Sequence, residues 1–280
     1  MSADMRAGRP AAGTASGGWL VVAGLGPGDA RLITPEVSAA LAEATDVVGY
    51  FPYVARVAAR PGLTLHASDN RVELDRAALA LRLASSGRRV VVVSSGDPGV
   101  FAMASALFEA VEAGPLAWRS LDLRVLPGIT AMLAAAARAG APLGHDFCAI
   151  NLSDNLKPWA LVEKRLRLAV QADFAIALYN PRSLARPDGF ARVLTLLRQD
   201  CGDARLVLLA RAVTTPDEQL RVLPLGEVQA EWVDMRTLVI VGSSLTRLLA
   251  RDAGTPWLYT PRSVAGAAVP TLAAAAIGTA

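Results

Sequence analysis

Short apolar runs alternate with amphipathic stretches along most of this 280-residue chain, and this alternation constrains the fold more than any other feature. The runs carry valine and leucine at successive positions, which is typical of strands buried on both faces of a sheet. The stretches between them carry apolar residues at three- and four-residue spacing, which is typical of helices. This order predicts an α/β fold in which crossover helices connect mostly parallel strands.

The expected strands fall into two series. In the first half of the chain they cover residues 19–23, 47–50, 63–67, 90–94 and 123–126, with helices over 35–44, 72–86 and 102–113. In the second half they cover residues 148–152, 174–179, 206–210 and 238–241. A chain of this length suits two ordinary hydrophobic cores. We therefore expect a disordered leader at 1–18, α/β domains at 19–141 and 142–250 with their border near residues 140–144, and a tail at 251–280.

Composition excludes several classes of protein. The net charge of +3 is too small to indicate a nucleic-acid partner. All but two of the 28 basic residues are arginine, which suits bidentate capture of carboxylates. Cys148 and Cys201 lie far apart and predict neither a disulfide framework nor a zinc site, so we expect a cytoplasmic protein without a bound metal. No signal peptide is expected, because residues 1–18 lack an apolar core. No membrane span is expected either, since residues 264–280 are short, alanine-rich and interrupted by Pro270.

Three of the expected strands end in glycine-rich loops. These loops are Gly24-Leu25-Gly26-Pro27-Gly28-Asp29, Ser94-Ser95-Gly96-Asp97-Pro98-Gly99 and Pro127-Gly128-Ile129-Thr130-Ala131. Glycine allows backbone turns and close approaches to a ligand that a Cβ atom blocks. Because ligands of open parallel sheets bind beyond the carboxyl ends of the strands, the three loops together predict a ligand crevice at this edge.

The first of these loops does not fit the dinucleotide-binding pattern. That pattern needs a glycine at the position of Asp29 and an acidic residue at the end of the second strand, which instead ends in Gly49-Tyr50 after Asp46. The chain also has no Gly-Lys-Ser/Thr motif of a P-loop. A carboxylate beside the loop favours a ligand with a ribose or a positive charge, so a nucleotide-dependent oxidoreductase is the weaker alternative.

The three loops together resemble those of the tetrapyrrole methylases, the S-adenosyl-methionine-dependent enzymes that methylate the corrin precursor of vitamin B12. The resemblance covers about residues 19–249. Three segments are similar to the family members that methylate carbon 17 of precorrin-3B and contract the ring to give precorrin-4, namely residues 94–103, 144–159 and 178–183. Other precorrin or cobalt-precorrin methylases share the loops and stay an alternative, as does a tetrapyrrole-binding protein without catalysis.

The resemblance implies a first α/β domain with a mostly parallel sheet, a second with a mixed sheet, a cofactor cleft between them, and a homodimer. The cofactor contacts that it implies are Pro27, Ser95, Gly96, Asp97, Val100, Thr130, Ala131, Asn180 and Ala212. A carboxylate at Asp97 either accepts hydrogen bonds from the cofactor or caps the helix that follows Pro98, and the two roles are compatible. The chain departs from the family pattern at Phe101, where tyrosine is expected, and at Ala102 and Ala212, where glycine is common.

Methyl transfer from a sulfonium needs alignment and exclusion of water more than it needs a catalytic side chain. Ring contraction, by contrast, needs a base for a hydroxyl proton and an acid that assists carbonyl formation. The candidates for these roles are His145, Asp154 and Glu218, and the sequence does not rank them.

The implied tetrapyrrole substrate carries several carboxylates, which gives the arginine-rich composition a use. The candidate substrate contacts are Arg182, Arg56, Arg71 and Lys157. Arg182 follows Pro181, whose fixed φ stiffens the turn and presents the guanidinium from a braced loop. The alternative for Arg182 is an ion pair with Asp188 or a helix cap.

Overall fold

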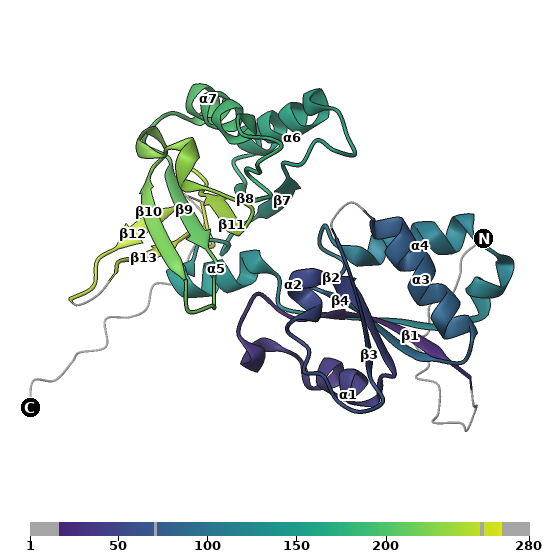
Figure 1. Cartoon of the computed structure of the whole chain (residues 1–280). Helices are drawn as coiled ribbons and strands as arrows, with labels where there is room; N and C mark the ends of the chain where they lie inside the picture. Colours follow the sequence, from purple (N-terminus) through teal and green to yellow (C-terminus); the bar gives the residue numbers. More distant parts are fainter. Residues whose placement is uncertain (1–16, 70–71, 253–254, 265–280) are drawn as a thin grey trace, which may run out of the picture. The chain divides into compact units, whose positions relative to one another are not determined.

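The structure is a computed structural model that describes residues 17–69, 72–252 and 255–264 (Figure 1). The chain divides into two compact units. The first comprises the described residues up to Gly26 together with Ala30–Gly128, and the second comprises Pro27–Asp29 and the described residues from Ile129 onward. The expected border at residues 140–144 lies one helix further along the chain, because helix α5 (Ala131–Ala139) packs on the sheet of the second unit. Most of the expected leader, and residues 265–280 of the expected tail, lie outside the described residues.

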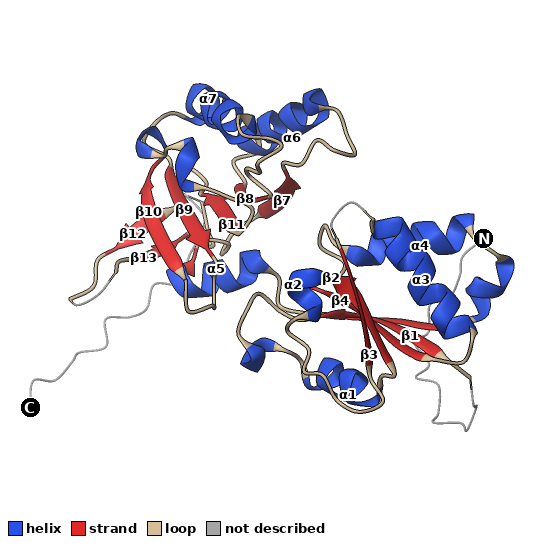
Figure 2. Cartoon of the chain, viewed as in Figure 1, coloured by secondary structure: helices blue, strands red, loops and turns tan. Residues whose placement is uncertain are grey.

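The first unit is a parallel sheet in the order β3-β2-β4-β1-β5, with helices on both faces (Figure 2). Its strands are β1 (Trp19–Gly24), β2 (Asp46–Tyr50), β3 (Thr64–Ser68), β4 (Arg89–Ser94) and β5 (Asp122–Leu126). Its helices are α1 (Pro35–Glu43), α2 (Phe51–Val54), α3 (Glu73–Ser85) and α4 (Met103–Ala113), with 3-10 turns at Ala30–Leu32 and Leu116–Ser120. The expected parallel sheet is confirmed, and every strand and helix expected in this half of the chain lies within one residue of its observed bounds.

The side chains of β1 alternate between two hydrophobic layers. Leu20 and Val22 pack with residues of α3 and α4, whereas Val21 and Ala23 pack with residues of α1 and α2, and all four are fully buried. Successive side chains of a strand point to opposite faces, so a sheet covered on both faces needs apolar residues at every position. The same requirement explains the unbroken valine run at residues 90–93 of β4.

A buried carboxylate lies at the amino-terminal edge of this sheet. Asp46, the first residue of β2, is 1% exposed and accepts hydrogen bonds from Arg88 Nε at 2.6 Å and Thr45 Oγ1 at 2.7 Å. His66 Nε2 lies 2.9 Å from its Oδ1. Burial on its own would raise the pKa of this carboxyl, but the hydrogen bonds from Arg88, His66 and Thr45 outweigh burial and hold the pKa below its usual value. Asp46, at the start of β2, therefore links this strand to His66 of β3 and to Arg88, the residue before β4.

The second unit contains a larger mixed sheet in the order β10-β9-β11-β8-β7 and a smaller sheet in the order β12-β13-β6. The strands of the larger sheet are β7 (Phe147–Asn151), β8 (Ala175–Tyr179), β9 (Leu206–Arg211), β10 (Gln219–Pro224) and β11 (Thr237–Val241). Those of the smaller sheet are β6 (Gly140–Ala141), β12 (Arg247–Leu249) and β13 (Trp257–Tyr259). The remaining elements are α6 (Trp159–Gln171), α7 (Gly189–Cys201) and 3-10 turns at Leu225–Glu227 and Ala230–Trp232. The expected mixed sheet is confirmed, since β7 and β8 are parallel and β11 is antiparallel to β8 and β9.

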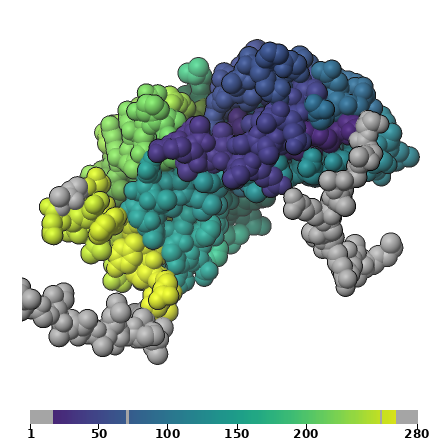
Figure 3. All heavy atoms as spheres, turned by 90° about the horizontal axis from the view of Figure 1, so that it is seen from below, coloured from purple at the N-terminus to yellow at the C-terminus, as the bar shows by residue number. Residues whose placement is uncertain are grey.

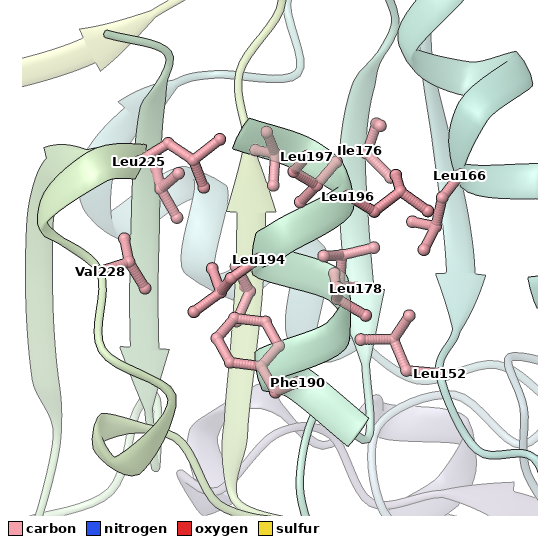
Figure 4. Packing of buried hydrophobic residues seen from close by; sticks show 14 of the residues in the cluster. Leu152, Leu166, Ile176, Leu178, Phe190, Leu194, Leu196, Leu197, Leu225 and Val228 are labelled. Atoms are coloured by element: carbon pink, nitrogen blue, oxygen red, sulfur yellow. The ribbon is translucent and has the colours of Figure 1, made fainter. Parts of the chain in front are cut away.

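Two hydrophobic layers cover the larger sheet. On one face, Phe190 and Leu197 of α7 pack with Leu166 of α6 and with Leu178 of β8 (Figure 4). On the other face, alanines of α5 pack with Leu258 of β13 and with β8, β9 and β11. Part of the expected tail therefore belongs to this core, and Figure 3 shows the C-terminal residues in yellow against the teal residues of the α5 and β6 region. Among the described residues, no helix has the length and apolar character needed to cross a bilayer.

Candidate functional site

The three glycine-rich loops of the sequence leave neighbouring strands of the first unit, because β4, β1 and β5 are adjacent. Gly26 and Gly96 donate backbone hydrogen bonds to each other at 3.2 and 3.0 Å. Both glycines have left-handed φ values, +66° and +63°, which residues with a side chain rarely adopt. A Cβ atom on Gly128 would overlap the carbonyl oxygen of Gly96 and lie 2.9 Å from Gly24 Cα. The glycines therefore allow the loops to pack against one another, a role that sequence reasoning had not separated from ligand approach.

Asp97 joins two of these loops. Its Oδ1 accepts a hydrogen bond from Gly99 N at 2.8 Å, and its Oδ2 accepts one from Gly128 N at 3.0 Å. The side chain thus bonds to loop backbone and does not cap α4, whose N-cap residue is Ala102. Each carboxylate oxygen has a second lone pair, so Asp97 keeps the capacity to accept hydrogen bonds from a ligand.

Arg56 braces the first loop from within the same unit. Its Nη1 donates to the carbonyl oxygen of Gly26 at 3.1 Å, and its Nη2 donates to that of Leu25. Burial lowers the pKa of this guanidinium. Arg56, an expected substrate contact, therefore has two structural partners in the first glycine-rich loop. Arg71, another expected substrate contact, lies outside the described residues.

In the second unit, β7, β8 and β9 run in the same direction, so their carboxyl ends lie at one edge of the sheet. Asn151 pairs with Tyr179 in the strand register, and Asn180 and Ala212 follow β8 and β9 directly. Asn180 Nδ2 donates a hydrogen bond to Asn151 Oδ1 at 3.0 Å. The structure therefore brings two expected cofactor contacts, Asn180 and Ala212, to the same edge.

Three non-glycine residues at this edge adopt a left-handed backbone conformation: Asn180 with φ +53°, Ala212 with φ +49° and Thr214 with φ +67°. Such conformations are strained for residues other than glycine and cluster at functional sites. Ala212 N donates to Arg236 O at 2.9 Å, and Thr215 Oγ1 donates to Ala212 O at 2.7 Å, which hold the turn in place. The left-handed φ of Ala212 is a physical reason for glycine to be common there.

The middle of the first loop belongs to this second unit. Asp29 N donates to Thr214 Oγ1 at 3.1 Å, and a Cβ atom on Gly28 would lie 2.5 Å from Thr215 Cγ2. Pro27, an expected cofactor contact, is therefore next to a glycine that packs closely on the turn after β9. Sequence separation hides this proximity, since about 185 residues lie between the two segments.

Tyr179 lies at this edge beside Asn180 but was not among the expected cofactor or catalytic residues. Its hydroxyl lies 2.5 Å from Thr130 Oγ1 and accepts a hydrogen bond from Met132 N at 3.1 Å. Thr130 is 5% exposed and is the N-cap residue of α5, followed by Ala131. Tyr179 thus fixes the start of α5 against β8, and its place directly before Asn180 at a strand end is the signal that could have identified it.

His145 lies at the opposite edge of the same sheet. It precedes β7, whose first residue is Phe147, whereas Asn180 follows the carboxyl end of the parallel strand β8. Five residues of extended strand separate the two ends, which at about 3.3 Å per residue is roughly 16 Å. The imidazole Nδ1 of His145 accepts a hydrogen bond from Asp146 N at 2.7 Å. His145 therefore does not lie at the edge that carries Asn180 and Ala212.

The two carboxylate candidates differ in their partners. Glu218 Oε2 lies 3.1 Å from Arg138 Nε and accepts a hydrogen bond from Thr214 N, so it supports the turn after β9. Asp154 follows β7 at the carboxyl edge, and its Oδ1 lies 3.8 Å from Arg186 Nε. The carboxylate of Asp154 is 38% exposed.

Two candidate substrate contacts are held by backbone carbonyls of nearby loops. Arg182 Nε donates to Pro187 O at 3.0 Å, so it bonds within its own loop. Lys157 Nζ donates to Ser153 O at 2.6 Å. Within the described ranges, no group of three or more His, Cys, Asp or Glu side chains is arranged to hold a metal ion.

Comparisons with known proteins identify the family. The family model described as tetrapyrrole (corrin/porphyrin) methylases matches residues 20–229. The chain is 54% identical over 250 residues to a precorrin-3B C(17)-methyltransferase of Sinorhizobium sp, covering 89% of this chain and 98% of that enzyme. It resembles the crystal structure of the methyltransferase CobJ with a TM-score of 0.83 and 66% identity, covering 87% of this chain and 100% of that one.

A more distant structure shares the fold. The uroporphyrin-III C-methyltransferase from Thermus thermophilus, solved in complex with S-adenosyl-homocysteine, matches with a TM-score of 0.62 and 23% identity, covering 80% of this chain and 97% of that one. The resemblance inferred from the three loops is thereby confirmed. Since the family model spans most of both units, the chain belongs to the tetrapyrrole (corrin/porphyrin) methylases.

Proposed function

We propose that this methylase transfers a methyl group from S-adenosyl-methionine to carbon 17 of precorrin-3B and contracts the macrocycle to give precorrin-4. The observation that carries the proposal is the 54% identity to the Sinorhizobium C(17)-methyltransferase, which extends over 98% of that enzyme. The carboxyl edge of the sheet in each unit supports it, because each edge collects residues expected to contact the cofactor.

The residues at these edges fit a cofactor that offers hydroxyl donors and a positive sulfonium and carries no phosphate. Asp97 has acceptor lone pairs left after its two backbone hydrogen bonds. When bound, S-adenosyl-methionine supplies an activated methyl group, so the chain has to hold and align the reactants and exclude water. The proposed contacts are Ser95, Gly96, Asp97 and Val100 of the first unit, and Pro27, Thr130, Ala131, Asn180 and Ala212 of the second.

Asp154 is the base that we propose for ring contraction. It follows β7 at the same edge as Asn180 and is partly exposed, so a substrate hydroxyl can reach it. Glu218 is engaged by Arg138 and by the backbone of Thr214, which suits a supporting role. His145 lies at the far edge of the sheet, which argues against contact with the reacting atoms.

Replacing His145 by alanine is therefore expected to leave the rate of methyl transfer and ring contraction within about threefold of wild type, since a general acid or base contributes about 10²- to 10⁴-fold. The measurement is the turnover number of the purified variant, with Asp154→Asn as the matched variant expected to lose most ring contraction. A hundredfold lower turnover number in His145→Ala, with an unchanged melting temperature, would show that His145 takes part in the reaction.

The decisive test of the proposed function is mass spectrometry of the product formed from purified precorrin-3B and methyl-labelled S-adenosyl-methionine. We expect one labelled methyl group at carbon 17 and a contracted ring. A label at another ring carbon, or turnover of the cobalt-containing precursor alone, would favour a neighbouring methylase of the pathway. Calorimetric binding of NAD(P) without binding of S-adenosyl-homocysteine would favour an oxidoreductase instead.

We also propose that the protein is a cytoplasmic homodimer. The dimer follows from the family resemblance, and the reducing compartment is supported by Cys148 and Cys201, both of which are free thiols. Burial raises the pKa of both thiols, which disfavours the thiolate form. Light scattering coupled to size exclusion tests the dimer, and a monomer at micromolar concentration contradicts it.

A further inference from the structure

Arg186, in the loop between β8 and α7, carries a guanidinium that its own chain leaves poorly satisfied. The side chain is 12% exposed. Its Nη1 lies 3.4 Å from the carbonyl oxygens of both Leu152 and Asn180, and its Nη2 lies 3.8 Å from Met235 Sδ. Its Nε is buried and finds no hydrogen-bond acceptor in the described part of the chain. These contacts place the guanidinium at the carboxyl edge of the sheet, where β7 and β8 end.

Contacts of this length are weak for a buried cation. A guanidinium has five N–H donors in a fork that matches a carboxylate, and such pairs have donor–acceptor distances of about 2.7 to 2.9 Å. The carboxylate of Asp154 is 3.8 Å from Arg186 Nε, which is too long for a hydrogen bond. Burial of a charge is unfavourable unless the charge is paired and hydrogen-bonded. Among the described residues, no carboxylate therefore forms a close hydrogen bond with Arg186.

A second cation lies near this guanidinium. Lys157 Nζ is held by Ser153 O, and burial, Arg165 and Arg186 together lower the pKa of the Lys157 ammonium group. The positive charges of Lys157 and Arg186 thus repel each other, and Asp154 only partly offsets this repulsion. An added carboxylate would relieve the repulsion and supply the missing acceptor.

The space beside Arg186 can admit such a group. A cavity of about 230 Å³ is lined by Leu152, Asp154, Trp159, Arg186 and Arg192, among others. On one wall of the cavity, the guanidinium of Arg192 stacks 4.2 Å from the ring centroid of Trp159. Arg192 therefore already has a partner.

The loops that carry Lys157 and Arg186 also carry apolar side chains close to them in sequence. Leu156 precedes Lys157, and Leu184 lies two residues before Arg186, and both leucines are fully exposed to solvent. Exposed leucines beside partly buried cations suit a ligand that has an apolar body and acidic groups at its rim.

We propose that Arg186, assisted by Lys157, binds a peripheral carboxylate of the tetrapyrrole substrate, and that Leu156 and Leu184 contact the macrocycle. The proposal rests on the proposed function for the identity of the substrate. It assigns the specificity-determining contact to Arg186, whereas the sequence pointed to Arg182, whose Nε is engaged by Pro187 O.

The test compares wild type with Arg186→Gln, Arg186→Lys and Arg165→Gln, using uroporphyrin and its methyl ester as probes in fluorescence titrations. Arg165 is exposed, so its variant is a control that removes the same charge nearby. We expect Arg186→Gln to weaken uroporphyrin binding about ten- to hundredfold, as loss of a charge-assisted pair does. We expect Arg186→Lys to retain part of the affinity, Arg165→Gln to stay within twofold, and binding of the ester to be unchanged in all variants.

Two results would overturn the proposal. One is uroporphyrin affinity in Arg186→Gln equal to that of wild type, and the other is an equal loss for uroporphyrin and its ester, which indicates a structural role in the loop. Melting temperature and calorimetric affinity for S-adenosyl-homocysteine check that each variant is folded. Wild-type protein that binds uroporphyrin through Arg186 but methylates no precorrin would refute the proposed function and leave the carboxylate site standing.

Discussion

Replacing Gly128 by alanine is expected to destabilise the first unit by about 3 kcal/mol and to lower its melting temperature by roughly 10 °C. The added Cβ atom would overlap the carbonyl oxygen of Gly96 and lie 2.9 Å from the backbone of Gly24. Both obstacles are backbone atoms of loops that are themselves hydrogen-bonded, so no flexible side chain can move aside. The loop after β5 therefore has to move away from the loops after β1 and β4. This movement should also weaken binding of S-adenosyl-homocysteine.

The control for this change is Gly189→Ala, at the first residue of α7. A Cβ atom there would meet only Pro181 O, at 3.9 Å, and alanine favours helix by up to about 1 kcal/mol over glycine. The same chemical substitution should therefore leave stability unchanged or raise it. Thermal and urea unfolding of the two variants measure the contrast, and a Gly128→Ala protein as stable as wild type would disprove the packing of the three loops.

Replacing Asp46 by asparagine is expected to lower the free energy of unfolding by about 1 to 3 kcal/mol at pH 7, because it removes a buried carboxylate that accepts several hydrogen bonds. The amide would face the guanidinium of Arg88 with a donor group and leave that cation without its carboxylate. Asp122→Asn is the matched control, since the pair of Asp122 with Arg124 is exposed and 3.5 Å long, and should change stability by less than about 1 kcal/mol. Equal effects of the two substitutions would contradict the assignment.

Asp46 also gives the stability a pH dependence of known sign. The pKa of its carboxyl is lowered in the folded state, so folding favours the ionised form. Its contribution is fully present above the unfolded pKa of about 3.9 and is lost as the pH falls through the lower folded value. The difference in the free energy of unfolding between wild type and Asp46→Asn should therefore shrink as the pH falls below about 4. A difference that stays constant in urea unfolding across this range would exclude a lowered pKa.

The fold of the first unit could be predicted from sequence because its three central strands, β1, β2 and β4, are buried on both faces. Residues 90–93 are all valine, and such a run has few other uses than a central strand. In the second unit, the sequence did not predict β10 (Gln219–Pro224), because it is an edge strand that mixes polar and apolar residues and ends in proline. β13 (Trp257–Tyr259) was assigned to the tail, since three residues give no periodicity and its pairing with β6 depends on residues far away in sequence.

The site could be predicted only in part. The glycine-rich loops and Asn180 were visible because turn residues follow buried strands directly. What those glycines contact was not visible, since the overlap of Gly128 with Gly96 arises from two loops that share no sequence pattern. Arg186 was hidden for a different reason, because an arginine-rich chain offers no local signal that separates a buried guanidinium from the solvated majority.

The first unit separates its two polar assemblies by the length of its strands. The ion-pair cluster around Asp46 lies at the amino ends of β2 and β4, while Gly26, Gly96 and Asp97 follow the carboxyl ends of β1 and β4. Substitutions in the carboxyl-edge loops therefore leave the ion-pair cluster in place. The two assemblies can therefore be exchanged as separate modules between homologous chains, provided that the three glycine-rich loops, which pack on one another, are moved together.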